Sequence, residues 1–179
     1  MKVAFSDVEV WFQDEARVGQ QGTNSRKWHD KKIRARAIKQ TEYEWAYIFG
    51  AVCPERDKAV CLIFPRVDTY SMNEHLREIS RNVAHGKIAV IICDRASWHT
   101  SSGLEIPDNI VLMPLPAYSP ELNSIEQFWQ RLRRLYFSNR RFKDYDDIVN
   151  ACADAINEFI VIPNAIKKLC SRSWASINV

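Results

Sequence analysis

Three observations predict an α/β fold for these 179 residues: a single domain (1–179) built on a mixed five-stranded sheet flanked by helices. Residues 8–14 alternate apolar and polar side chains, which is typical of a strand. Residues 88–93 form an unbroken apolar run, typical of a strand buried on both faces and therefore covered by helices on both sides. Residues 120–137 and 144–160 instead repeat their apolar side chains at helical spacing.

The first half of the chain predicts an antiparallel meander of three strands. The strand at 8–14 is followed by strands at about 44–53 and 59–64. The last two are joined at 54–57 by Pro-Glu-Arg-Asp, a sequence typical of a turn. The basic stretch ending at Lys39 is interrupted by polar residues and glycines, which favours a loop or an exposed hairpin.

The middle of the chain predicts one helix and two further strands. The helix is expected to begin near Ser71, because Ser71 and Glu74 have the spacing of a capping box. The apolar run 88–93 follows and ends at Asp94. A short fifth strand is expected at 110–113.

Two helices are predicted to complete the fold. The first is expected over 120–137, with Ser119 as the N-cap and Pro120 at the first helical position. The second is expected over 144–160. Apolar side chains of the first helix step by three and four residues and predict a stripe facing the core, made of Leu122, Ile125, Trp129, Leu132 and Tyr136. Glu126 lies beside this stripe and not opposite it.

Composition and charge narrow the class of protein. Hydrophobic residues make up 46% and charged residues 26%, as in an ordinary globular domain. No apolar run approaches the roughly 20 residues of a membrane span, and residues 1–7 lack a secretory signal. Five scattered cysteines favour buried thiols in a reducing compartment over disulfides or zinc ligation. We therefore expect a cytoplasmic protein without a membrane partner.

Basic residues form two clusters, although the net charge is only +3. Either cluster alone is typical of a solvated charged surface. Two clusters flanking a set of acidic residues favour a nucleic acid, because neutralised phosphates release condensed counterions. The clusters comprise Arg26, Lys27, Lys31, Lys32, Arg34, Arg36 and Lys39, and then Arg131, Arg133, Arg134, Arg140, Arg141 and Lys143.

Three carboxylates have the placement that a metal site requires. Asp14 and Asp94 stand at or near the ends of predicted strands, where open α/β sheets bind ligands. Glu126 lies on the following helix, and either aspartate alone is more typical of a turn cap. Three carboxylates suit two Mg²⁺ ions, which cleave a phosphodiester by activating the nucleophile and neutralising the phosphate. The histidines show no zinc-like spacing.

Several motifs resemble those of the DDE transposases of the mariner type and their bacterial insertion-sequence relatives. Gln13–Arg17, reading Gln-Asp-Glu-Ala-Arg, is similar to the first catalytic motif, and Cys93–His99 to the second. Leu115–Trp129, which contains Tyr-Ser-Pro-Glu-Leu-Asn-Ser-Ile-Glu, is similar to the third and is the most specific. Arg26–Trp28 resembles an Arg-x-Trp element. Ser124 departs from the family, which usually has proline there.

The resemblance implies an RNase H-like fold and a transposase that cleaves transposon ends and transfers the strand. Asp14, Asp94 and Glu126 would be the catalytic metal ligands for two Mg²⁺, with Mn²⁺ as substitute, and Asn123 and His99 would support them. It also implies double-stranded DNA as substrate, a homodimer and a prokaryotic, nucleoid-associated location. The residues expected to bind DNA are Arg26, Lys27, Trp28, Lys31, Lys32, Arg34, Arg36, Arg133 and Arg134.

Three alternatives stay open at the level of sequence. Glu15 competes with Asp14 as the first catalytic carboxylate. The chain could be a non-catalytic DNA-binding or dimerising remnant, against which its intact carboxylates argue. It could also be an RNase H-like host nuclease, against which the third motif argues. Helix-turn-helix domains that relatives carry before the catalytic domain are absent from this sequence, so we expect a catalytic half, with the DNA-recognition half encoded separately or removed.

Overall fold

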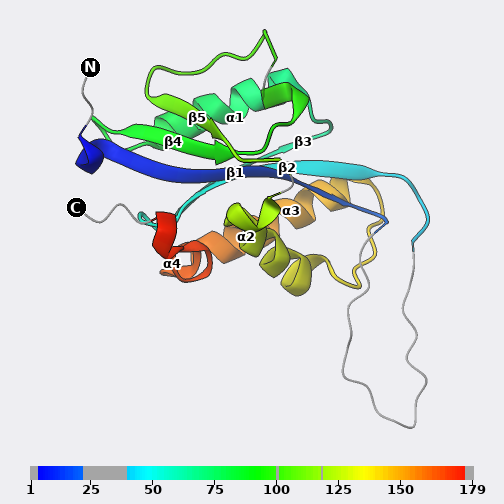
Figure 1. Ribbon diagram of the computed structural model, residues 1–179. Helices are drawn as coiled ribbons and strands as arrows, with labels where there is room; N and C mark the ends of the chain where they lie inside the picture. The colour runs from blue at the N-terminus through cyan, green and yellow to red at the C-terminus, as the bar shows by residue number, and fades with distance from the viewer. Residues whose placement is uncertain (1–3, 22–39, 100, 118, 176–179) are drawn as a thin grey trace.

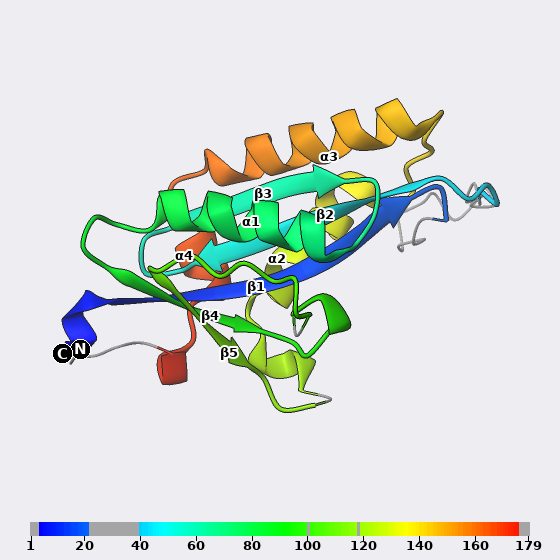
Figure 2. The same ribbon diagram turned by 90° about the horizontal axis from the view of Figure 1, so that it is seen from above.

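A five-stranded mixed sheet forms the centre of the computed structural model, which describes residues 4–21, 40–99, 101–117 and 119–175. The strands lie in the order β3-β2-β1-β4-β5 (Figure 2). β1 pairs antiparallel with β2 and parallel with β4, while β2–β3 is antiparallel and β4–β5 parallel. The strands span Val8–Gly19, Trp45–Cys53, Lys58–Phe64, Ile88–Cys93 and Ile110–Pro114, in chain order. The predicted meander and mixed sheet are confirmed.

Helices cover both faces of the sheet, as the buried β4 predicted (Figure 1). α1 (Thr69–Asn82) packs on one face, and α2 (Ile125–Leu132), α3 (Tyr145–Ile160) and α4 (Ala165–Cys170) lie on the other. Short 3-10 turns occur at Phe5–Asp7, Ser97–His99, Pro120–Leu122 and Ser173–Ala175, and a π-helical turn follows α2 at Arg133–Phe137. α4 was not predicted. Within the described residues, no helix has the length and apolar character needed to cross a membrane.

The sheet separates two apolar cores. The core under α1 contains Trp11, Phe49 and Leu76, each with no exposed surface. The core on the opposite face contains Phe12 and Trp129, which are 1% exposed. Because successive residues of a strand face opposite sides, neighbouring positions of β1 contribute to different cores. This alternation places adjacent side chains of β1, including those of Asp14 and Glu15, on opposite sides of the sheet.

β1 extends five residues beyond the end that the sequence predicted, to Gly19 instead of Asp14. Antiparallel pairing with β2 continues from Phe12↔Val52 to Gly19↔Trp45 and carries the strand through the charged residues. Asp14 therefore lies inside a strand and not at its end. The local pattern could not show this, because the pairing partner lies about 30 residues further along the chain.

The start of α1 also differs from the prediction. Asp68 is the N-cap, and its Oδ1 accepts a hydrogen bond from the backbone N–H of Ser71 at 2.8 Å. Ser71 is the third helical residue, and its hydroxyl donates to the same carboxylate oxygen at 2.9 Å. Glu74 pairs with Arg77 instead of closing a capping box. An aspartate three residues earlier thus outcompeted the serine as the cap.

The helix predicted over 120–137 is interrupted. Pro120–Leu122 form one 3-10 turn, and Ser119 makes no side-chain cap. Asn123 then adopts an extended backbone, with φ −93° and ψ 103°, so α2 begins only at Ile125. The core stripe is confirmed for Ile125, Trp129 and Leu132. The break at Asn123 allows its side chain to reach β1.

Candidate active site

The parallel pairing of β1 with β4 places Asp14 and Asp94 at the same level of the sheet. The last paired residues are Phe12 and Ile92. Asp14 and Asp94 each lie two residues beyond this pair along the chain. They therefore occupy neighbouring positions on adjacent strands. β4 ends at Cys93, which puts Asp94 just beyond the strand, as predicted. Asp14 reaches the same level from within the longer β1.

One pocket of about 400 Å³ gathers the predicted metal ligands. Asp14 from β1, Asp94 after β4 and Glu126 from the first turn of α2 all line it, together with Asn123. We call it the acidic pocket; its other lining residues are Arg95, Ala96, Leu115, Pro116, Ala117, Ser119 and Pro120. The predicted set of three carboxylates therefore converges from three different elements.

Asp14 is a carboxylate with too few donors around it. Its pKa is raised to about 7, first by desolvation and then by the negative charges of Glu15 and Glu126. Two hydrogen bonds oppose these effects: the backbone N–H of Glu15 donates to Asp14, and Trp129 Nε1 donates to Asp14 Oδ2 at 3.0 Å. A cation in the pocket would relieve the same repulsion.

Trp129 reaches Asp14 because a glycine lies beneath it. Gly50 is the direct partner of Asp14 on β2. A Cβ atom at Gly50 would collide with the indole ring of Trp129 and approach Ile125. The glycine inside a strand thus marks a close approach of helix and sheet, which is one of its usual roles. The sequence showed Trp129 only as a core residue and did not reveal its contact with Asp14.

Asp94 is held by its own loop and by His99. Its side chain is 57% exposed, and its Oδ1 accepts from the backbone N–H of Ala96 at 2.9 Å. His99 Nδ1 lies 2.9 Å from the same oxygen. The other ring nitrogen of His99 lies 3.2 Å from Glu15 Oε1. The structure therefore brings the predicted supporting residue His99 between two carboxylates, although His99 itself does not line the acidic pocket.

The charge of His99 follows from these neighbours. Burial lowers its pKa, but the hydrogen bond and charge of Glu15, with those of Asp94, outweigh burial and raise the pKa overall. Two ionised carboxylates accept but do not donate, so both ring nitrogens act as donors when the ring is protonated. His99 is thus a clamp between β1 and the loop after β4.

Glu15 is a buried carboxylate to which the sequence gave no structural role. Its side chain is only 8% exposed, and its Oε1 receives three donors. Gln13 Nε2 donates at 2.9 Å, Trp98 Nε1 at 3.2 Å, and His99 is the third. The Trp98-His99 pair in the second motif was the available signal, because buried tryptophan and histidine N–H groups require acceptors.

Asn123 ties the start of α2 to the catalytic strand. Its Nδ2 donates to the backbone oxygen of Gln13 at 2.8 Å, next to Asp14. Its Oδ1 is buried and has no hydrogen-bond partner among the described residues. The structure places Asn123 in the lining of the acidic pocket, and its supporting role stays a prediction. The extended backbone that interrupts the helix is what allows the amide to reach β1.

The residues fit a divalent cation in charge and donor type. Mg²⁺ and Mn²⁺ favour carboxylate, carbonyl and water oxygens, and the pocket supplies three carboxylates and one orphaned amide oxygen. Among the described residues, no group of three or more histidine, cysteine, aspartate or glutamate side chains lies close enough together to hold a metal ion; the three carboxylates line one pocket without sharing a set of ligand positions. An open carboxylate site that leaves room for water and a phosphate matches the way Mg²⁺ is bound at phosphoryl-transfer sites.

The predicted DNA-binding residues are only partly within the described structure. Arg133 and Arg134 are exposed on the turn after α2. Arg134 lines a small polar pocket with Arg131 and Gln130. The predicted residues Arg26, Lys27, Trp28, Lys31, Lys32, Arg34 and Arg36 lie outside the described residues.

The strand order, the helical layers and the acidic pocket define an RNase H-like domain with a carboxylate centre. Comparison with known families identifies it further: the DDE superfamily endonuclease family matches residues 9–149. The chain belongs to this family. The match includes Asp14, Asp94 and Glu126.

The chain is also similar to one curated relative and, in its fold, to solved structures. The uncharacterized protein y4pE/y4sA of Sinorhizobium fredii is 52% identical over 131 residues, covering 73% of this chain and 97% of the relative. The mariner Mos1 paired-end complex with Mn matches with a TM-score of 0.67 at 14% identity over 93% of this chain. The Mos1 strand transfer complex matches with a TM-score of 0.65 at 16% identity over 90%. The chain spans about half of each Mos1 chain, 52% and 51%.

Proposed function

We propose that this chain is the catalytic domain of a transposase, which cleaves double-stranded DNA at transposon ends and transfers the freed strand to target DNA. The observation that carries the proposal is the convergence of Asp14, Asp94 and Glu126 in one open pocket. Family membership supports the class of reaction. The structural neighbours are Mos1 strand-transfer and paired-end complexes, the latter with Mn or Mg.

Asp14, Asp94 and Glu126 would hold two Mg²⁺ ions, with Mn²⁺ as a substitute. Bound there, the ions would activate the attacking water or 3′-hydroxyl and neutralise charge on the scissile phosphate. Asp14, inside β1, and Asp94, directly after β4, would hold the ions from neighbouring strand positions. Glu126 approaches from α2, whose position is set by the hydrogen bond between Asn123 and β1. His99 would keep Asp94 in place through the contacts of its Nδ1 with the Asp94 backbone oxygen and with Asp94 Oδ1.

Arg95 gives the acidic pocket one positive charge of its own. Its Nε donates to the backbone oxygen of Leu115 at 3.0 Å, which fixes the side chain on the pocket wall. A guanidinium there can contact a phosphate oxygen while the carboxylates bind metal. This residue lies where the related transposases commonly have asparagine or a small residue. We propose that it orients the DNA backbone at the site.

The partners belong to the same proposal. Strand transfer joins two DNA ends to a target, so a homodimer is the expected form. Recognition of the transposon ends would come from a separate DNA-recognition half. Arg133 and Arg134, exposed beside α2, would contact the DNA backbone, and the location would be the prokaryotic nucleoid.

The decisive experiment compares the parent with Asp94→Asn in a DNA cleavage assay with Mn²⁺. Substrates are nonspecific duplex DNA and candidate terminal-repeat DNA. The variant should fold normally, because the Asp94 side chain is largely exposed and an amide oxygen can still accept from Ala96. Its cleavage should fall below detection. Asp154→Asn, on the exposed face of α3, is the matched control and should cut like the parent.

Three other results would each reject part of the proposal. Equal cleavage by Asp94→Asn and the parent would exclude the assigned metal site. A folded parent that binds DNA but does not cut it with Mn²⁺ or Mg²⁺ would indicate the non-catalytic remnant. Cleavage without joining of the freed 3′-hydroxyl to target DNA would favour the host nuclease.

A further inference from the structure

Two side-chain hydrogen bonds attach α2 and the residues before it to β1, and Glu126 lies midway between their donors. Asn123 Nδ2 donates to the backbone oxygen of Gln13 at 2.8 Å. Trp129 Nε1 donates to Asp14 Oδ2 at 3.0 Å. Residues three apart lie on the same side of a helix, so Glu126 and Trp129 face β1 together. The two bonds therefore set the position of Glu126 relative to Asp14.

Core packing holds the indole of Trp129 against Asp14. The side chain is 1% exposed, and its ring centroid lies 5.2 Å from that of Phe128. On the sheet side the ring lies directly over Gly50, the partner of Asp14 on β2, where a Cβ atom would collide with it. The indole is therefore enclosed from both sides, and its N–H stays directed at one oxygen of Asp14.

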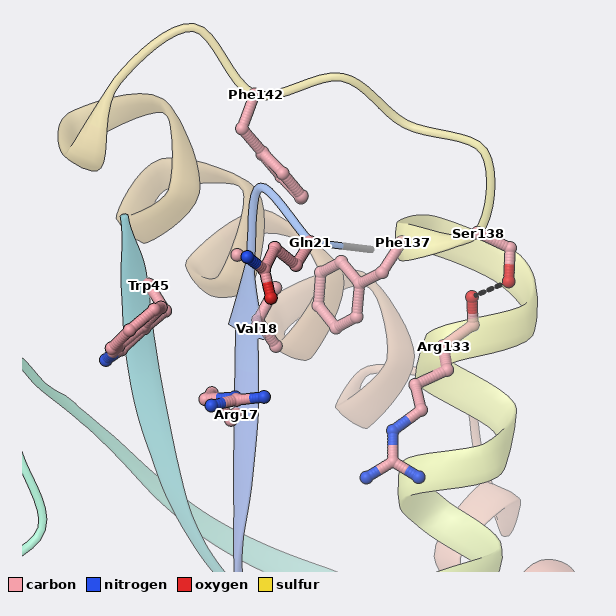
Figure 3. A pocket seen from close by; sticks show the side chains of 9 residues that line it. Arg17, Val18, Gln21, Trp45, Arg133, Phe137, Ser138 and Phe142 are labelled. Atoms are coloured by element: carbon pink, nitrogen blue, oxygen red, sulfur yellow. Dashed lines mark hydrogen bonds between the residues drawn. The ribbon is translucent and has the colours of Figure 1, made fainter. Parts of the chain in front are cut away.

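Beyond Trp129, β1 and the segment after α2 enclose a second pocket of about 310 Å³ (Figure 3). Arg17 and Val18 of β1 line one side of it, and Arg133 and Phe137 of the π-helical turn line the other. The strand and the helical segment thus separate there. Among the described residues, Trp129 is the one residue of α2 that hydrogen-bonds β1, so it holds the helix on the strand next to the acidic pocket.

The indole leaves Asp14 one oxygen without a side-chain donor. Trp129 engages Oδ2, and none of the described side chains donates to Oδ1. The other donor to this carboxylate is the backbone N–H of Glu15. A cation in the acidic pocket therefore meets a carboxylate that is already bound to α2 through Oδ2. Binding through both oxygens would compete with the indole N–H, whereas binding through Oδ1 alone would leave that hydrogen bond intact.

Divalent cations differ in how they use a carboxylate. Ca²⁺ takes about six to eight oxygen ligands at roughly 2.3–2.6 Å in a flexible geometry, and it often binds both oxygens of one carboxylate. Mg²⁺ requires a near-ideal octahedron at about 2.0–2.1 Å and keeps several waters. The two oxygens of one carboxylate are closer together than neighbouring corners of that octahedron. A fixed carboxylate that offers one oxygen therefore favours Mg²⁺ over Ca²⁺.

We propose that Trp129 is a positioning residue that makes the acidic pocket select Mg²⁺ over Ca²⁺. Its indole N–H holds Oδ2 of Asp14 and leaves Oδ1 for the cation, while the helix that carries the indole also holds Glu126. This inference rests on the proposed function, since it takes Asp14 and Glu126 as metal ligands. It adds that a core residue, which is not itself a ligand, decides which cation is bound.

The test measures cation binding without DNA, so that cleavage does not enter. Mn²⁺ is the probe: electron paramagnetic resonance reports the free ion, and Mg²⁺ or Ca²⁺ is added until half of the bound Mn²⁺ is displaced. In the parent, Mg²⁺ should reach this point at no higher concentration than Ca²⁺. Trp129→Phe keeps an aromatic ring but lacks the N–H. In this variant the ratio of the half-displacing Ca²⁺ concentration to that of Mg²⁺ should fall about fivefold, the effect expected of one hydrogen bond.

Trp11→Phe is the matched control. Trp11 is a fully buried tryptophan of β1, and its Nε1 donates to the carboxylate of Glu9, also at 3.0 Å. Glu9 does not line the acidic pocket. The control therefore loses the same kind of hydrogen bond but should keep the Ca²⁺ to Mg²⁺ ratio of the parent. Asp94→Asn should weaken Mn²⁺ binding, which assigns the bound ion to the acidic pocket.

Two results overturn the role of Trp129: an unchanged ratio in folded Trp129→Phe, or an equal fall of the ratio in Trp11→Phe. If Trp129→Phe does not fold, the parent decides, because displacement of Mn²⁺ by less Ca²⁺ than Mg²⁺ contradicts the selectivity. A parent that cuts DNA while Trp129→Phe keeps the ratio would reject this role and leave the proposed function standing. A parent whose Mn²⁺ binding does not depend on Asp94 would reject the metal site and the proposed function with it.

Discussion

Asp14 and Glu15 are consecutive carboxylates of β1 that meet opposite conditions on the two faces of the sheet. Asp14 faces the α2 side, where its donors are the Trp129 indole N–H and the backbone N–H of Glu15, and the charges of Glu126 and of the adjacent Glu15 repel it. Glu15 faces the other side, where a single oxygen receives donors from Gln13, Trp98 and His99. The carboxylate of Asp14 therefore has few hydrogen-bond donors, whereas one oxygen of Glu15 has three.

The difference shows how the number of donors decides what a buried carboxylate can do. A charge that already has its hydrogen bonds is locked and stabilises its surroundings. A charge without them is costly, and a cation from solution can lower that cost. Asp14 therefore suits metal binding, while Glu15 suits a structural anchor for His99 and, through it, Asp94. This comparison favours Asp14 over Glu15 as the first catalytic carboxylate.

The largest effect should come from Asp14→Asn. Cleavage with Mn²⁺ should fall below detection, because a ligand carboxylate is lost. The free energy of unfolding should stay equal or rise by about 1 kcal/mol above pH 7, because the amide removes a desolvated charge and still accepts from Trp129. Urea denaturation and the cleavage assay measure the two quantities. A variant that cuts, or that loses stability, would contradict this assignment.

Compared with Asp14→Asn, Glu15→Ala should lose more stability and less cleavage activity. The free energy of unfolding should fall by about 3 kcal/mol, because the indole of Trp98 and the ring of His99 lose a buried acceptor. Cleavage should decrease about 10- to 100-fold but persist, as for residues that position a metal ligand. Glu15→Gln keeps one acceptor oxygen, so it should lose less stability and less cleavage activity than Glu15→Ala. Complete loss of cleavage in well-folded Glu15→Ala would make Glu15 the better candidate for the ligand.

On the α1 side of the sheet, His75 is a buried base whose pKa differs between the folded and unfolded chain. Burial lowers its pKa from 6.5 to about 4, against the hydrogen bond to the Val60 carbonyl at 3.3 Å and the charge of Glu15. The unfolded chain therefore binds more protons between these two pH values. Stability is fully present above pH 6.5 and is lost as the pH falls towards 4, by about 3 kcal/mol.

The pH dependence can be isolated by substitution. Urea denaturation of His75→Leu across this pH range should lack the slope that His75 contributes to the parent. The absolute stability of the variant does not enter, because only the slope is compared. His85→Gln, at an exposed position after α1, is the control and should retain the slope. An unchanged slope in His75→Leu would show that other groups govern the acid sensitivity.

The smallest effect should come from Ser124→Pro, on the Asp14 side. Ser124 has φ −68°, which proline adopts, and the extended backbone of Asn123 suits a residue before proline. The Ser124 hydroxyl is buried without a partner among the described residues. The substitution should therefore raise the free energy of unfolding by about 1 kcal/mol. Ser124→Ala separates the hydroxyl from the backbone effect, and a less stable Ser124→Pro would show that the ring does not fit.

Local pattern was sufficient for most of the fold. The apolar run 88–93 predicted β4 to the residue, because a strand buried on both faces needs apolar side chains at every position. The helix over 145–160 was equally clear, since its core face repeats at helical spacing. Predictions failed where distant groups compete for a backbone, as in the longer β1 and the interrupted helix at Asn123.

The sequence by itself determined the order of the elements, the family motifs and the three candidate carboxylates Asp14, Asp94 and Glu126. Only the tertiary structure decided that Asp14 and Glu15 have different surroundings, because alternation along a strand is symmetric until layers cover the two faces. It also decided the contact between Trp129 and Asp14, which Gly50 on a separate strand allows. Local propensity follows from neighbours in the chain, whereas donors, charges and cavities follow from neighbours in space.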